Sequence, residues 1–119
     1  VNDEHRIIGY YTLSSSGLRR EDVPDQFKKR IKNHYSIPVI LLGRLAIGNK
    51  YKRQGYGAFL LIDALKRALH TSEKSIGAMA VIVEPIDRLA FSFYEKYGFS
   101  ELEDSGKMFL PMQVIKKLP

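Results

Sequence analysis

The middle of this 119-residue chain holds a strand, an amphipathic helix and a second strand in direct succession, and this order constrains the fold most. Residues 37–47 form a long apolar run that is typical of a strand buried on both faces. Residues 78–83 form a second such strand. Between them the apolar residues fall on one helical stripe, which consists of Gly57, Leu60, Leu61, Ala64, Leu65, Ala68 and Leu69. A crossover of this kind places the two strands parallel and adjacent in one sheet.

The first third of the chain predicts one more strand and an irregular segment. Residues 6–13 are β-branched and aromatic, which favours a strand, and the Ser- and Gly-rich residues 14–17 indicate a turn. Asp22 and the residues after it suit the start of a short helix that leads into a basic run at 28–32.

The last third predicts a helix and a final strand. Asp87 suits the N-cap of a helix, and Gly98 suits the left-handed residue that closes it. Residues 108–114 predict the strand. The length suits one core, so we expect residues 1–119 to form a single α/β (α+β) domain.

A basic, glycine-rich turn, Lys52-Arg53-Gln54-Gly55-Tyr56-Gly57, opens the amphipathic helix. Helix N-termini present N–H groups and a partial positive charge, which suit a pyrophosphate. Gly55 and Gly57 let the backbone approach an anion without a Cβ atom in the way. A plain tight turn from strand to helix is the alternative interpretation of these glycines. The turn is neither a P-loop nor a dinucleotide-binding fingerprint, because Gly-Lys-Ser/Thr and the third glycine are missing.

Charge favours a polyanionic partner. The net charge is +6, and basic residues cluster at 19–20, 28–32 and 50–53. Such clusters favour nucleic acid, because neutralised phosphates release counterions. A solvated basic face without a partner is the alternative.

Several classes of protein are not indicated. The chain has no cysteine, and His5, His34 and His70 lie far apart, so we predict no disulfide and no metal site. No segment approaches the roughly 20 apolar residues of a membrane-spanning helix, and no secretory signal opens the chain. We therefore expect a cytoplasmic protein without membrane contact.

Two motifs resemble a known family, the GNAT acetyltransferases. A strand, a basic residue, x-x-Gly-x-Gly/Ala and a helix form that family's acetyl-coenzyme A signature, which residues 52–57 match. Residues 90–99, Ala-Phe-Ser-Phe-Tyr-Glu-Lys-Tyr-Gly-Phe, are similar to its closing helix and strand. The resemblance extends from about Ile7 to the end. It implies a GNAT fold, with a mixed central sheet, a splayed parallel strand pair and helices on both faces. It also implies acetyl-coenzyme A as the acetyl donor and no metal.

The resemblance narrows to the GNAT toxins of toxin–antitoxin pairs. Residues 10–15, 38–47 and 109–112 carry this similarity. It implies acetylation of the amino group of the amino acid on charged tRNA, which stops translation. It also implies a ribbon-helix-helix antitoxin as partner and, by analogy, a homodimer.

The sequence departs from the family in two places. Lys52 stands where Arg or Gln is usual, which keeps the charge but loses planar hydrogen-bonding geometry. The first strand and the following helical segment of a GNAT domain have no counterpart. We therefore expect an N-terminally incomplete domain, and no acceptor residue is carried over from the family.

The resemblance assigns roles to individual residues. Tyr94 is the expected general acid, since a phenol with a pKa near 10 keeps its proton at neutral pH and can protonate a thiolate. A core tyrosine on an amphipathic helix is the alternative. A backbone N–H near Ile47 is the expected oxyanion donor. The expected cofactor-binding residues are Leu45, Ala46, Ile47, Lys52, Arg53, Gln54, Gly55, Tyr56, Gly57, Ala58 and Phe93.

Two residues and the function keep open alternatives. Glu84 is either a base that deprotonates the amine through a water or an exposed carboxylate that ends the strand. We favour the second, because an aminoacyl-ester amine needs no strong base. Arg44 contacts RNA phosphate or pairs internally with an acid. The alternative functions are acetylation of a small amine or protein amino group, and an inactive module that binds acetyl-coenzyme A or nucleic acid.

Overall fold

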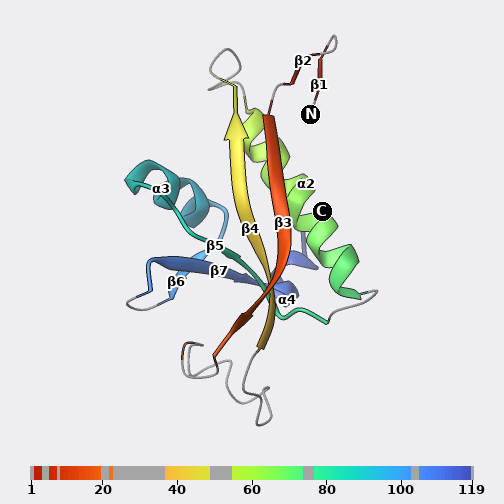
Figure 1. The fold of residues 1–119 in the computed structure, drawn as a ribbon, viewed down its shortest axis with the longest axis vertical. Helices are drawn as coiled ribbons and strands as arrows, with labels where there is room; N and C mark the ends of the chain where they lie inside the picture. Colours follow the sequence, from red (N-terminus) through yellow and green to blue (C-terminus); the bar gives the residue numbers. More distant parts are fainter. Residues whose placement is uncertain are drawn as a thin grey trace.

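A five-stranded mixed sheet forms the centre of the chain (Figure 1). The computed structural model describes residues 2–3, 6–7, 9–19, 22, 37–48, 55–73, 77–102 and 105–118. The strands follow one another across the sheet in the order β3 (Gly9–Leu18), β4 (Ile37–Ile47), β5 (Ala80–Val83), β7 (Lys107–Pro111) and β6 (Ser100–Leu102). The short strands β1 (Asn2–Asp3) and β2 (Arg6–Ile7) form a separate antiparallel pair.

Strands β3 and β4 form a long antiparallel ladder. The predicted turn at residues 14–17 is wrong, because β3 continues to Leu18 and pairs with the apolar first half of β4. Gly9 lies at the other end of the ladder. A Cβ atom there would lie 2.6 Å from the Ala46 carbonyl oxygen and 2.8 Å from Leu60 Cδ1, so this position needs glycine for close packing.

Strands β4 and β5 are the predicted parallel neighbours, and they separate early. Only Ile40 with Val81 and Leu41 with Ile82 are paired, although β4 continues to Ile47. Beyond Leu41 the two strands diverge, so β4 keeps β3 as its partner along one edge and is no longer paired with β5 along the other (Figure 1). The predicted splayed pair is therefore confirmed.

The described helices are α2 (Tyr56–Thr71), α3 (Arg88–Lys96) and α4 (Met112–Ile115). Helix α2 buries five of the seven residues of the predicted stripe, Leu60, Leu61, Ala64, Leu65 and Ala68. The last predicted strand is wrong beyond Pro111, where α4 begins. Met112 donates its N–H to the Met79 carbonyl oxygen at 2.8 Å, and the chain turns there so that Met112 and Ile115 are both buried. The predicted short helix after Asp22 lies outside the described residues.

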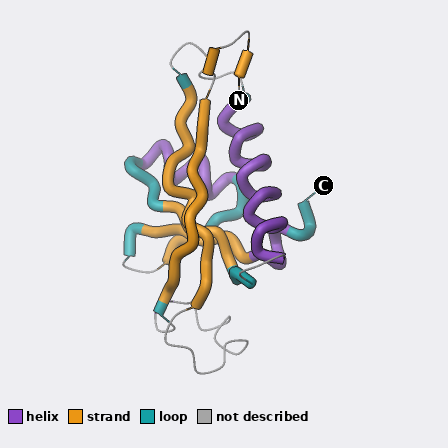
Figure 2. Tube along the Cα trace, turned by 45° about the vertical axis from the view of Figure 1, so that its right-hand side comes forward, coloured by secondary structure: helices purple, strands orange, loops and turns teal. Residues whose placement is uncertain are grey.

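Side-chain alternation along the strands divides the core into two clusters. The first contains most of the buried residues of α2 and those of α3 and α4, and α2 lies along this face beside β3 and β4 (Figure 2). The crossovers from β4 to β5 and from β5 to β6 run in the same direction across the sheet, so right-handed connections place both helices on one face. The second cluster consists of strand residues alone, Leu18, Ile37, Val39, Ala80, Ile82, Leu102 and Phe109. The predicted helices on this second face have no counterpart among the described residues. None of the helices described is long and apolar enough to cross a membrane.

A polar link joins β3 to α2. The Tyr11 hydroxyl donates a hydrogen bond to Asp63 Oδ2 at 2.5 Å, and Arg67 Nε lies 3.4 Å from the same oxygen. Burial, then the hydrogen bond to Asp63 and its charge, raise the pKa of Tyr11 to about 12. The link thus fixes α2 against β3 at Tyr11, the residue that pairs with Leu45 of β4.

We expect Tyr11→Phe to lower the free energy of unfolding at pH 7 by about 1–2 kcal/mol, because Asp63 loses a donor. The pKa of Tyr11 is higher in the folded chain than the value near 10 of an unfolded tyrosine. Its contribution is therefore complete below pH 10 and is lost as the pH rises to about 12. Urea unfolding from pH 7 to 11 should show a shallower alkaline decline for the variant. Parallel curves for variant and wild type would contradict this role, and Tyr10→Phe is the control at the exposed neighbour.

Candidate active site

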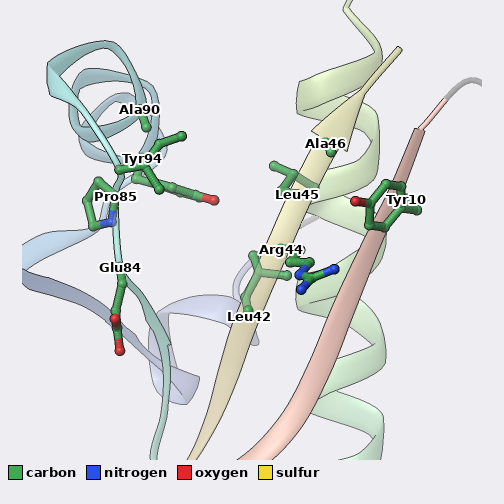
Figure 3. A pocket seen from close by; sticks show the side chains of 11 residues that line it. Tyr10, Leu42, Arg44, Leu45, Ala46, Glu84, Pro85, Ala90 and Tyr94 are labelled. Carbon is green, nitrogen blue, oxygen red and sulfur yellow. The ribbon is translucent and has the colours of Figure 1, made fainter.

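Two cavities with shared lining residues lie at the opening where β4 and β5 separate. One, of about 490 Å³, lies between the start of α2 and the helix α3; we call it the helix-side cavity. The other, of about 250 Å³, lies between the β3–β4 ladder and the end of β5; we call it the strand-side cavity (Figure 3). Leu45, Ala90 and Tyr94 line both. A group bound in either cavity would therefore lie beside these three residues.

Tyr94 is held in place by its own helix. The Asp87 side chain accepts a hydrogen bond from the Ala90 N–H at 2.8 Å, which confirms the predicted N-cap, and Gly98 closes the helix at φ 99°. The Tyr94 ring packs edge-on against Phe93 and Phe99, with centroids 5.4 and 5.3 Å apart.

The Tyr94 hydroxyl points into the opening toward β4 (Figure 3). The residue is only 8% exposed, and burial raises the pKa of its phenol. A phenol in this place holds its proton at neutral pH and can donate it to a group bound in the opening.

The N-terminus of α2 faces the helix-side cavity. Gly55 occupies the N-cap position with φ 83°, a left-handed conformation that favours glycine. Among the described residues, no side chain caps this end and no acidic residue lies in the first turn. The first-turn N–H groups of a helix have no intrahelical acceptor, so this end suits an anion. Gly55, Gly57 and Ala58 line the cavity.

Gly57 leaves room between α2 and α3. A Cβ atom at Gly57 would lie 3.7 Å from the Phe93 ring, at the edge of ordinary contact, so a longer side chain would project into the helix-side cavity. Phe93 lines that cavity too. Lys52, Arg53 and Gln54, the basic part of the predicted anion site, lie outside the described residues.

Residues at the end of β4 line both cavities. Leu45 and Ile47 line the helix-side cavity, whereas Ala46 lines the strand-side cavity. The backbone here pairs with β3 on one edge but is beyond the last β5 pair on the other. The free edge suits an extended ligand that carries amide groups, which would pair with it as a strand does. Of the predicted cofactor-binding residues, Tyr56 alone among those described lines neither cavity.

Arg44 and Glu84 both line the strand-side cavity and are exposed. The Glu84 carboxylate points away from Tyr94 (Figure 3), as expected of a carboxylate at a strand end. Sequence reasoning gave no role at the site to six residues that line this cavity, which are Tyr10, Leu42, Gly43, Pro85, Ile86 and Ala90. The alternation of residues 6–13 marks Tyr10 as outward-facing, but only the register of β3 on β4 shows which site it reaches.

Residues 24–116 match the profile of the acetyltransferase (GNAT) domain family. This chain belongs to the GNAT family. The expectation from the two motifs is therefore confirmed.

The GNAT chain is similar to proteins named as toxins. A Mycobacterium tuberculosis (strain ATCC 25618 / H37Rv) protein named tRNA-acetylating toxin is 34% identical over 94 residues, which make up 79% of this chain and 55% of that protein. The chain thus spans about half the length of that relative. The predicted resemblance to the GNAT toxins is confirmed.

Solved structures of such toxins have the same fold. A tyrosine-to-phenylalanine mutant of KacT matches with a TM-score of 0.89 and 32% identity, over 99% of this chain and 71% of that chain. AtaT complexed with acetyl-methionyl-tRNAfMet matches with a TM-score of 0.86 and 33% identity, over 97% and 69%. A mutant AtaT bound to the C-terminus of the antitoxin AtaR and acetyl-CoA matches with a TM-score of 0.74 and 29% identity, over 93% and 64%.

Proposed function

We propose that this GNAT domain transfers an acetyl group from acetyl-coenzyme A to the amino group of the amino acid on charged tRNA. The observation that carries the proposal is the meeting of two cavities at Tyr94, one beside an uncapped helix N-terminus and one open to an acceptor. The toxin bound to acetyl-CoA supports the donor, and the tRNA-acetylating relative supports the acceptor.

The residues suit the donor as follows. The first turn of α2, with Gly55 and Gly57, binds the pyrophosphate. Lys52, Arg53 and Gln54, which precede this turn in the sequence, stay predicted cofactor-binding residues. The free edge of β4 at Leu45–Ile47 binds the amide groups of the pantetheine arm, beside Ala58 and Phe93. When bound, acetyl-coenzyme A supplies an acetyl group activated as a thioester.

The transfer itself needs one proton to move. The amine nitrogen forms a bond to the acetyl carbon, the bond from that carbon to sulfur breaks, and the amine loses a proton. Tyr94 donates its hydroxyl proton to the departing sulfur and regains a proton from solvent, which takes up the proton that the amine loses. A backbone N–H near Ile47 stabilises the negative charge on the acetyl oxygen. Glu84 is not required as a base, because an aminoacyl-ester amine is weakly basic.

Partners follow from the same proposal. A toxin of this kind is held in check by an antitoxin, and the complex of AtaT with the C-terminus of AtaR supports one here. We propose a ribbon-helix-helix antitoxin and a homodimeric toxin, and a location in the cytoplasm, where charged tRNA occurs. The net charge of +6 suits an RNA substrate.

The test is transfer of label from acetyl-coenzyme A to bulk charged tRNA, with uncharged tRNA and free amino acids as controls. Label on charged tRNA alone supports the proposal, and sorting the labelled tRNAs identifies the amino acid. Bound cofactor with label only on small amines or proteins would favour the broader N-acetyltransferase activity. Bound cofactor with no transfer to any acceptor would favour an inactive binding module.

A further inference from the structure

The rim of the strand-side cavity carries an exposed aromatic ring and an exposed guanidinium on neighbouring strands. Tyr10 on β3 is 48% exposed, and Arg44 on β4 is exposed as well. We propose that Tyr10 stacks on an unpaired base, and Arg44 binds a phosphate, at the single-stranded 3′ end of the acceptor RNA. This inference rests on the proposed function and adds a binding site to it.

The register places the two side chains on one face. Tyr10 is opposite Ala46 and Thr12 is opposite Arg44, so Tyr10 and Arg44 are diagonal neighbours, within reach of long side chains. The intervening Tyr11 and its partner Leu45 face the core beside α2. Figure 3 shows Tyr10 and Arg44 near each other, across the opening from Tyr94.

A bulge at Gly43 orients Arg44 outward. Thr12 pairs with Arg44 and Leu13 pairs with Leu42, so Gly43 is the extra residue on β4. Without it, Arg44 would share the core-facing side of Ile40 and Leu42. A Cβ atom at position 43 would lie 2.9 Å from Thr12 Oγ1, so glycine suits the bulge. The bulge thus presents a cation next to the reaction centre.

The chemistry of the rim favours a nucleotide. Within the described part of the chain, no ion pair engages Arg44, and the other charged residue of the cavity, Glu84, points away from the opening. An exposed aromatic ring stacks on any base, and an adjacent guanidinium binds phosphate. The cavity of about 250 Å³ suits a terminal aminoacyl group, which leaves the preceding nucleotides at the rim. Proteins recognise RNA mostly at such unpaired ends.

The test compares two acceptors in acetyl transfer, charged tRNA and the methyl ester of the same amino acid, which has no nucleotide. We expect Tyr10→Ala and Arg44→Ala each to raise the KM for charged tRNA about 10-fold more than the KM for the ester. Tyr10→Phe should restore the KM for charged tRNA, because the ring remains. The affinity for acetyl-coenzyme A, measured separately, reports whether each variant keeps its cofactor site.

Salt dependence gives a second readout. Arg44→Ala should reduce the slope of log(kcat/KM) for charged tRNA against log salt by about 1, whereas Tyr10→Ala should not. Lys66→Ala removes one charge from the exposed surface of α2, outside the cavity, and should leave the slope as it is.

The outcomes separate this inference from the proposed function. If the wild type acetylates charged tRNA but the variants show the same rise in KM for both acceptors, or no rise at all, the RNA site is overturned and the proposed function stands. Failure of Tyr10→Phe to restore the KM overturns stacking. Wild-type transfer to the ester but never to charged tRNA overturns the proposed function, and the RNA site with it.

Discussion

Replacing Tyr94 with phenylalanine should lower kcat for acetyl transfer about 10²- to 10⁴-fold, the range that a positioned general acid contributes. The variant lacks only the hydroxyl, which points into the opening between the two cavities. Its ring keeps the edge-on contacts with Phe93 and Phe99, so the fold and the helix-side cavity should persist. The KM for acetyl-coenzyme A should therefore change only a few-fold, as single-turnover and steady-state kinetics would show.

The pH profile adds a check on the same residue. Burial raises the pKa of Tyr94 above the usual value near 10, so its proton stays in place throughout the neutral range. The rate should therefore not fall across the neutral range through loss of this acid, and an alkaline decline from its ionisation should be absent in Tyr94→Phe. Tyr97→Phe is the matched control, because Tyr97 lines only the helix-side cavity. A Tyr94→Phe enzyme with unchanged kcat and normal cofactor affinity would exclude Tyr94 as the acid.

Much of the fold follows from local patterns. The apolar stripe from Leu60 to Ala68 has helical spacing, which identifies α2. Asp87 and Gly98 have strong conformational preferences for the two ends of a helix, which identifies the bounds of α3. The turn expected at residues 14–17 fails because partner strands override composition. The serines of β3 pair with apolar residues of β4, and these partners are distant from each other in the sequence. The strand predicted over residues 108–114 is wrong at Met112–Ile115, because a helix of four residues carries too little periodicity to be recognised in the sequence.

The site divides in the same way. Tyr94, Gly55 and Gly57 lie in contiguous motifs, so the sequence alone identifies them as candidates. No sequence feature gives Tyr10 or Pro85 a role at the site, and both reach the strand-side cavity only through the tertiary arrangement. The orientation of Arg44 depends on a one-residue bulge, which shifts the faces of β4, and such an irregularity leaves little trace beyond a glycine. Cavities between strands and helices thus depend on register, which local patterns specify poorly.

The second large effect concerns the opening between α2 and α3. Gly57→Leu should weaken acetyl-coenzyme A binding at least about 100-fold, or roughly 2.7 kcal/mol. Its Cβ atom would lie 3.7 Å from the Phe93 ring, so the remaining carbons occupy the helix-side cavity. Helix propensity should not oppose folding, because glycine is the weaker helix former by about 1 kcal/mol. Isothermal titration with acetyl-coenzyme A measures the affinity, and thermal unfolding without ligand measures the fold.

Two further variants separate filling of the cavity from damage to the helix. Gly57→Ala adds only the Cβ atom, at an ordinary contact distance, and should retain most of the affinity. Gly55→Leu should also abolish binding but for another reason. A Cβ atom there meets nothing within 4 Å, yet the φ of 83° strains any larger residue and displaces the first-turn N–H groups. Normal affinity in both leucine variants would show that the start of α2 does not bind the pyrophosphate.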